Sequence, residues 1–325
     1  MAEDYTYAVA RIRALENGLF TDGTIDQLIN CKDVPQCVRF LEEKGWGDTE
    51  TAGNGEAILA REEEKIWETV KDLHIDMKLF RVLSLPKEFH NLKAAVKAAA
   101  TDGKHADIYY EGTEIKGEDL EEIIRERDFD RLPDSMKNAA EEAYDTLLHT
   151  GDGQACDIVI DRACLEAVRE AGKDAGKAGS GVIRDYAETI VSIADIRTAV
   201  RSAKTGKQLD FLMKALVDTD SLSADHLAKS AAQGVDQVRE YLLTTDYRDA
   251  AEYLAKSPSA FERWCDDQII ESLQPQKYEA FTIGPVVAYV IARQTEIKTV
   301  RLILTGKANG LSDEDIRERV RHMYV

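Results

Sequence analysis

A segment that recurs every 104 residues constrains the fold of this 325-residue chain more than any other feature. The segment reads polar, aliphatic, basic and then apolar, and its copies begin at Asn91, Asp195 and Thr299 without insertions between them. Such a period is longer than the roughly 20 to 50 residues of a solenoid unit. We therefore expect three similar helical bundles around a pseudo-threefold axis. Each copy ends in a polar break that suits a helix C-cap, namely Thr101-Asp102-Gly103, Thr205-Gly206-Lys207 and Asn309-Gly310-Leu311.

The expected fold class is all-α. No proline lies between Pro133 and Pro258, and that interval is rich in residues that lose little side-chain freedom in a helix. Only residues 107–115 resemble a strand, which is too little for a sheet. The repeat places three units at residues 1–107, 108–211 and 212–325, the first with an N-terminal helix and the last with a C-terminal helix. The head of the middle unit, from Gly117, matches the other two poorly.

Three helices can be predicted individually. The clearest of them begins at Gly284-Pro285 and runs into Thr305-Gly306. Proline suits the first helical position, because the amide that it lacks would have no intrahelical partner there. The apolar stripe of this helix is interrupted or bordered by Arg293 and Arg301. A short last helix follows Ser312 as its N-cap, and an opening helix stops at Gly18.

The net charge of −19 argues against nucleic acid as a partner, because binding it means neutralising phosphates with Lys and Arg. Anionic lipid surfaces are disfavoured for the same reason. Basic protein surfaces are the partners that such a field would steer, although solubility alone would also explain an acidic chain. No signal peptide is visible at the N-terminus, and the apolar run 283–292 is half the length of a membrane span. We expect a cytoplasmic protein that does not insert into the membrane.

Apparent catalytic motifs are weak, and we expect no catalytic residue, cofactor or metal. Residues 172–178 resemble a phosphate-binding loop, but the spacing is one residue short and no Ser or Thr follows the lysine, so we interpret them as a flexible loop. Asp266 and Asp267 resemble the Mg²⁺ motif of prenyl synthases without the second motif that such enzymes need. The six histidines are scattered, and the five cysteines, which form no CxxC pair, are interpreted as reduced core residues.

Both ends of the chain carry a family resemblance. Residues 7–15 at the N-terminus and residues 284–289, 296–301, 306–311 and 318–321 at the C-terminus resemble the C subunit (also called the d subunit) of V-type and A-type rotary ATPases. The segments at Lys93 and Arg197 fit the family's three-domain pattern, and the resemblance is weakest from about Glu111 to Lys177. At Thr299 the pattern would call for the asparagine found at Asn91.

The resemblance implies a funnel-shaped, non-enzymatic protein between the central shaft and the membrane rotor ring. Its partners would be the D and F subunits of the central shaft and the cytosolic loops of the ring, and it would transmit torque for proton or sodium transport from a peripheral cytoplasmic position. Which ion is carried, and whether ATP is made or consumed, would be decided by other subunits. The interface residues we expect are the repeat-related bases and two arginines of the last helix: Lys93, Arg197, Arg301, Arg317 and Arg321.

Two other functions stay open from the sequence alone. The first is a cytosolic helical scaffold for other protein partners, which would not bind a D–F shaft complex. The second is a Mg²⁺-dependent prenyl-type synthase built on Asp266 and Asp267, which Mg²⁺ and diphosphate would stabilise against heat. The repeat-related bases also have a plainer interpretation, because they could pair with acids inside their own bundles.

Overall fold

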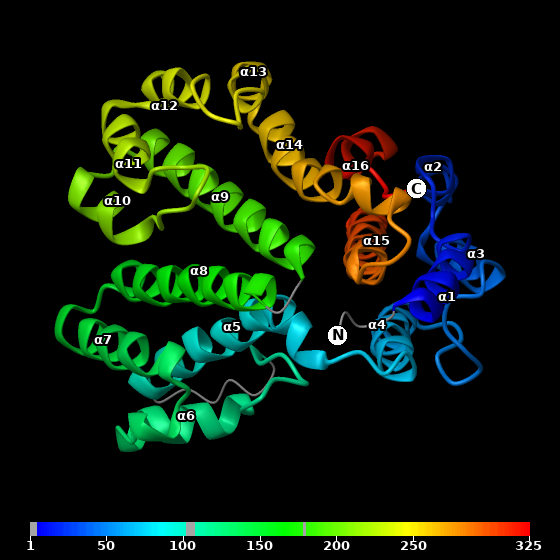
Figure 1. Cartoon of the computed structure of the whole chain (residues 1–325), viewed down its shortest axis with the longest axis horizontal. Coiled ribbons are helices and arrows are strands. Elements are labelled where there is room, and N and C mark those ends of the chain that lie inside the picture. The colour runs from blue at the N-terminus through cyan, green and yellow to red at the C-terminus, as the bar shows by residue number, and fades with distance from the viewer. Residues whose placement is uncertain (1–4, 102–107, 178–179) are drawn as a thin grey trace. The chain divides into compact units, whose positions relative to one another are not determined.

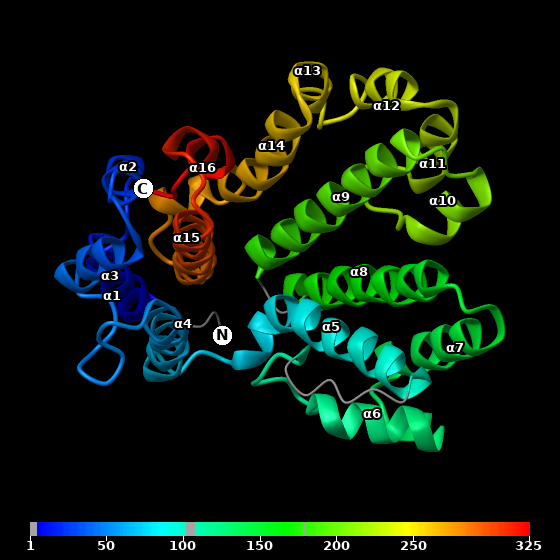
Figure 2. The ribbon, with the colours of Figure 1, turned by 180° about the vertical axis from the view of Figure 1, so that it is seen from behind.

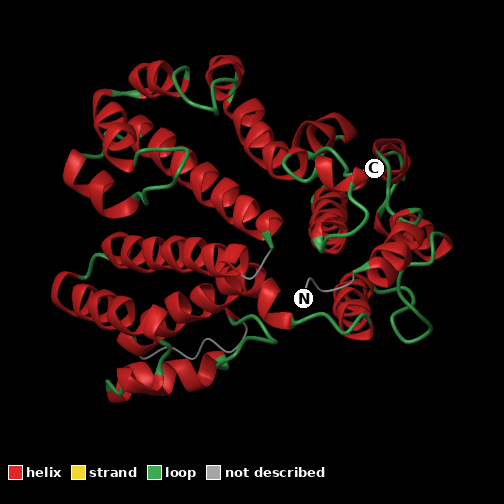
Figure 3. Ribbon diagram, viewed as in Figure 1, coloured by secondary structure: helices red, strands yellow, loops and turns green. Residues whose placement is uncertain are grey.

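The structure of the protein is a computed structural model that describes residues 5–101, 108–177 and 180–325 (Figure 1). Within these residues the chain forms sixteen α-helices and no strand (Figure 3). The all-α prediction is therefore confirmed. Residues 108–115, most of the strand-like stretch, contain bends and no strand.

The contacts within the chain gather into two compact units. The terminal unit comprises Met1–Met77 and Glu252–Val325, and the central unit comprises Lys78–Ala251. The division at residues 107 and 211 and the pseudo-threefold arrangement stay predictions.

The terminal unit is organised around one buried helix, α15 (Gly284–Ala308), which packs against α1, α3 and α4. Seventeen of its twenty-five residues are buried, so it is covered on nearly all sides. It begins at Gly284-Pro285 as predicted. Ser312 accepts a hydrogen bond from the Asp315 amide at 3.1 Å and caps the last helix, also as predicted. The other helices of this unit are α1 (Thr6–Glu16), α2 (Asp22–Ile29), α3 (Val34–Glu43), α4 (Gly55–Asp72), α14 (Pro258–Glu271) and α16 (Asp313–Arg319), and α13 (Ala250–Lys256) begins at the boundary.

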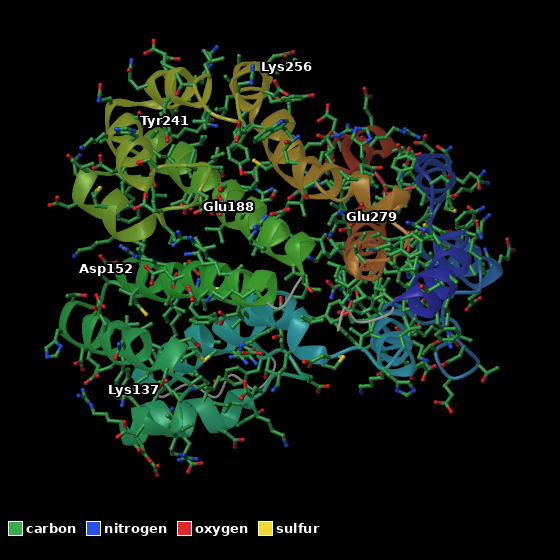
Figure 4. All side chains as sticks on the ribbon, viewed as in Figure 1. Lys137, Asp152, Glu188, Tyr241, Lys256 and Glu279 are labelled. Atoms are coloured by element: carbon green, nitrogen blue, oxygen red, sulfur yellow. The ribbon has the colours of Figure 1, made fainter. Side chains whose placement is uncertain are left out.

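The central unit is organised around α8 (Gly153–Lys177), which packs against α5, α7, α9 and α10. Figures 1 and 2 show α8 between α7 and α10 from both sides. Asp152, labelled in Figure 4, caps α8 by accepting hydrogen bonds from the amides of Gln154 and Ala155. The remaining helices are α5 (Arg81–Ala100), α6 (Gly117–Glu126), α7 (Asp134–Thr150), α9 (Gly181–Lys204), α10 (Leu209–Ala215), α11 (Ala224–Gln233) and α12 (Val235–Leu242).

The three copies of the repeat lie on the long helices α5, α9 and α15, and they are buried in the same pattern. In each copy the first, second, fifth and sixth residues are buried. The basic third residue and the fourth residue are not. The breaks after α9 and α15 also match, because Gly206 and Gly310 have positive φ angles of 67° and 68°. Lys207 and Leu311 each donate a backbone hydrogen bond of 3.0 Å back into their helix, to Ser202 and Gly306. The break after α5 includes residues outside the described ranges.

The interpretation of residues 172–178 as a flexible loop is wrong as far as the structure describes them, because α8 continues to Lys177. Gly172 is buried, and a Cβ atom there would collide with the Cβ of Ala187 on α9. The glycine therefore allows two helices to approach closely, and the apparent phosphate loop is a helix-packing site.

Replacing Gly172 with alanine is expected to destabilise the central unit by about 1–3 kcal/mol, although alanine is the better helix former, because the extra methyl group overpacks the contact with Ala187. Gly181→Ala is the matched control, since a Cβ atom at Gly181 meets nothing within 4 Å. Urea denaturation followed by far-UV circular dichroism measures both variants. Equal stability of the two variants would contradict the packing role.

Candidate interface residues

A buried ion cluster joins α4 to α15 in the terminal unit. The Arg293 guanidinium on α15 binds the carboxylates of Glu62 on α4 and Glu296 one turn further along α15. All three residues are at most 7% exposed. The Arg293 guanidinium also lies over the Trp46 ring, 4.8 Å from its centroid. The buried negative charge of Glu62 on α4 is therefore paired with the buried positive charge of Arg293 on α15.

Every member of the ion cluster has further partners. Glu62 also accepts hydrogen bonds from the Gly47 amide at 2.8 Å and the Lys65 ammonium at 2.6 Å. Glu296 accepts one from the Phe20 amide. Burial raises the pKa of Glu296, while the Arg293 charge acts in the opposite direction. The groups of the cluster are buried and already engaged in hydrogen bonds and ion pairs. The cluster therefore fixes helices in place and offers no group for chemistry on a substrate.

The central unit has a row of polar side chains on α9 that holds the chain after α10. Glu188, labelled in Figure 4, accepts hydrogen bonds from the amide and hydroxyl of Ser221 at 2.9 and 2.8 Å. The Ser192 hydroxyl lies 2.8 Å from that of Thr219. Asp195 accepts a hydrogen bond from the Val217 amide at 2.9 Å. Burial raises the pKa of the Asp195 carboxyl to about 8.

The same positions are polar and buried in all three copies of the repeat. Ser192 and Asp195 correspond to Glu88 and Asn91 on α5, and to Glu296 and Thr299 on α15. Asn91 binds the segment that follows its own helix through the Tyr110 amide at 2.7 Å and the Tyr110 carbonyl at 2.8 Å. The repeat therefore carries buried polar positions as well as apolar ones.

The predicted repeat-related bases are distributed over both units. Lys93 on α5 binds Asp161 on α8, and its side chain is 24% exposed. Arg197 is half-buried on α9. Arg301 on α15 lies 3.4 Å from Glu56 on α4, and its side chain is 48% exposed. Lys93 and Arg301 thus pair with acids of their own units, and the convergence of the three bases on an axis stays a prediction.

The two C-terminal arginines also have partners inside the terminal unit. Arg317 on α16 donates hydrogen bonds to Asp26 at 3.1 Å and Asn30 at 3.0 Å, both from the region of α2. Arg321 lies beyond the end of α16, so its placement on the last helix is wrong, and it binds Asp266 on α14. These pairs tie the end of the chain to two other helices. A role for Arg317 and Arg321 at an interface with another protein stays a prediction.

One exposed apolar site is not evident from the sequence. Tyr278 and Phe281, in the segment between α14 and α15, are 90% and 76% exposed. The segment is anchored by Arg13 on α1, which donates hydrogen bonds to the carbonyls of Gln276 at 2.7 Å and Glu279 at 2.8 Å (Glu279 is labelled in Figure 4). Two aromatic residues close together are visible in the sequence, but their exposure follows from tertiary packing.

The aspartate pair of the prenyl-synthase alternative is engaged within the protein. Asp266 binds Arg321, and Asp267 accepts a hydrogen bond from the His322 amide at 3.0 Å. Asp267 is also 3.5 Å from the Arg263 guanidinium. Among the described residues, no three His, Cys, Asp or Glu side chains are grouped as a metal site. No helix in the described ranges is both long enough and apolar enough to span a membrane.

Comparison with known proteins finds similarity along nearly the whole chain. The family model for the ATP synthase (C/AC39) subunit matches residues 8–319. The C subunit of the V-type sodium ATPase of Enterococcus hirae is 24% identical over 96% of this chain and 97% of its own length. The C subunit of the A-type ATP synthase of Methanocaldococcus jannaschii is 24% identical over 96% of this chain and 85% of its own length. The chain belongs to the ATP synthase (C/AC39) subunit family.

Proposed function

We propose that this chain is the non-catalytic subunit that couples the central shaft of a V/A-type ATPase to its membrane rotor ring. It would bind the D and F subunits of the shaft on one side and the cytosolic loops of the ring on the other. In that position it would transmit torque for proton or sodium transport. It would lie at the cytoplasmic face of the membrane as a peripheral part of the complex.

The observation that carries this proposal is the set of buried polar ties within a chain of this family. A subunit that passes force between two partners must resist sliding of its helices, and apolar contacts are non-directional. Hydrogen bonds and ion pairs depend on direction and distance, so they resist such sliding. The Arg293 cluster and the polar row on α9 supply them in the two units.

Reconstitution tests the proposal. We expect the purified chain to form a complex with a purified D–F shaft and, separately, with a rotor ring in nanodiscs. In vesicles that hold the motor without this subunit, adding the chain is expected to restore ATP-driven ion uptake, because the shaft is then connected to the ring. Replacing both Arg301 and Arg317 with alanine tests two predicted contact residues, and Arg61→Ala on α4 is the surface control.

Two results would count against the proposal. A chain that binds neither the shaft nor the ring would favour the scaffold alternative. Full ion uptake in vesicles without the chain would show that coupling does not require it. Unchanged binding by the Arg301 and Arg317 variant would remove those two residues from the interface and leave the coupling role intact.

A further inference from the structure

The central unit contains a groove of about 860 Å³ whose floor is α8 and whose walls are α7 and α10. Both wall helices pack against α8. The floor is apolar and made largely of small residues, with Ile158, Val159 and Ala163 each only half-buried. Phe211 of α10 adds an aromatic side chain to one wall. Partly exposed aliphatic residues on a helix floor form a surface that another apolar face can cover.

The groove follows α8 for about four turns. Its floor residues recur at three- and four-residue spacing from Ala155 to Glu170, which is a length of about 22 Å at the rise of an α-helix. Four turns of one helix face match the contact that a second helix makes when it packs alongside. Small residues such as Ala163 and Ala167 let two helix axes approach closely.

The rim of the groove is acidic. Five carboxylates line it against two basic side chains, Arg162 and Lys214. Arg162 is already engaged, by Glu166 at 2.8 Å and by the Met213 carbonyl at 3.0 Å. Within the described part of the chain, the carboxylates of the other four acids, Asp134, Glu142, Glu170 and Asp210, have no side-chain hydrogen bond or salt bridge, and only Asp134 and Glu170 have a lysine charge near them, from Lys137 and Lys177.

We propose that this groove binds an amphipathic helix of a protein partner, with its apolar face on α8 and lysine or arginine side chains along its flanks. The apolar floor supplies the area that is buried, and the acidic rim selects a basic partner and sets its orientation. An acidic helix is excluded by repulsion from the same rim. The inference goes beyond the proposed function and does not depend on it.

A synthetic peptide tests the groove directly. The probe is a fluorescein-labelled helix of about 18 residues, ~27 Å long, built from Leu, Ala and Lys with an apolar face and Lys flanks. One control peptide carries Glu in place of Lys, and a second has the same composition in scrambled order. Fluorescence anisotropy with the full-length chain is expected to show binding of the Lys peptide at least about tenfold tighter than either control. Higher ionic strength is expected to weaken that binding.

Two variants connect the binding to the groove. Ala163→Trp places a large side chain on the floor of the groove. It is expected to weaken binding of the Lys peptide by about tenfold or more, because the apolar face of the peptide can no longer reach α8. Ala232→Trp on α11 is the matched control, because Ala232 is exposed and does not line the groove. Replacing Glu142 and Glu170 with lysine, two exposed positions on the rim, is expected to reverse the preference between the Lys and Glu peptides.

Three results would overturn the proposal. The first is equal binding of the Lys peptide by the native chain and by a folded Ala163→Trp variant. The second is equal binding of the ordered and scrambled peptides, which would show attraction by charge alone. The third is a concentration-dependent dimer in sedimentation velocity that Ala163→Trp abolishes, because the occupant would then be a second copy of this acidic chain. The rim variant keeps the test decisive if Ala163→Trp fails to fold.

Discussion

Replacing Arg293 with methionine is expected to lower the free energy of unfolding of the terminal unit by about 3–5 kcal/mol, the usual cost of breaking a buried ion pair by removing one partner. Methionine keeps much of the side-chain volume, so the change in the free energy of unfolding arises mainly from the loss of the charge. Glu296 would then be left in the core without a cation at 2% exposure, and Glu62, at 3% exposure, would keep only the partly exposed Lys65 ammonium. Neither carboxylate could reach water without moving α4 or α15.

The terminal unit carries its own spectroscopic reporter. All three tryptophans of the chain, Trp46, Trp67 and Trp264, belong to it. Trp46 stacks against Phe20 with ring centroids 4.9 Å apart and lies under the Arg293 guanidinium. Urea denaturation followed by tryptophan fluorescence therefore measures the stability of the terminal unit without a contribution from the central unit.

A surface variant and a rescue variant separate charge from packing. Arg61→Met on α4 removes exposed salt bridges to Glu64 and Glu68 and is expected to change stability far less, because such pairs are solvated and screened. Adding Glu62→Gln and Glu296→Gln to Arg293→Met neutralises the stranded carboxylates and is expected to restore part of the loss. If the triple variant is no more stable than Arg293→Met alone, the cost does not arise from unpaired charge.

Helices of this chain can be predicted from the sequence because their signals are local. The start of α15 follows from Gly284-Pro285, the cap of α16 from Ser312, and the end of α9 from Gly206. The prediction at Gly172 was wrong for a physical reason. Glycine weakens an isolated helix, but here its missing side chain is what allows α8 to contact Ala187, and no local rule contains that contact.

The candidate site is harder to predict because its partners are distant in sequence. Arg293 was visible as a base interrupting an apolar stripe, but Glu62 lies 231 residues away. The repeat aligned Asn91 with Asp195 and Thr299, and burial at these positions could have been expected from their place beside the aliphatic residues. That Asn91 and Asp195 bind the segments after their helices depends on the tertiary structure.

Replacing Asp195 with asparagine is expected to flatten the pH dependence of stability of the central unit. The carboxyl is fully buried, one oxygen accepts from the Val217 amide, and the other has no hydrogen-bond partner among the described residues. Burial raises its pKa to about 8, with opposing effects from the nearby charges of Arg162 and Asp218. Asparagine, which the repeat itself places at position 91, keeps an oxygen for the Val217 amide and cannot ionise.

The sign of the effect follows from proton linkage. An unfolded aspartate ionises near pH 3.9, so between about pH 4 and pH 8 the folded state holds one proton that the unfolded state has lost. The contribution of this carboxyl to the free energy of unfolding is greatest at low pH. It declines by about 1.4 kcal/mol per pH unit as the pH rises toward the folded pKa. From about pH 5 to pH 8, the native chain should lose on the order of 3 kcal/mol relative to Asp195→Asn.

The measurement compares the two chains at a series of pH values, because the difference between them removes the titration of all other groups. Far-UV circular dichroism in urea follows both units, and the transition without a tryptophan fluorescence change belongs to the central unit. Asp174→Asn on α8, which removes an exposed carboxylate of the same unit, is the matched control. A constant difference between the native chain and Asp195→Asn across the same range would show that Asp195 is already ionised in the folded protein. The polar row on α9 would then hold a buried negative charge, and its hydrogen bond to Val217 would be a charged one.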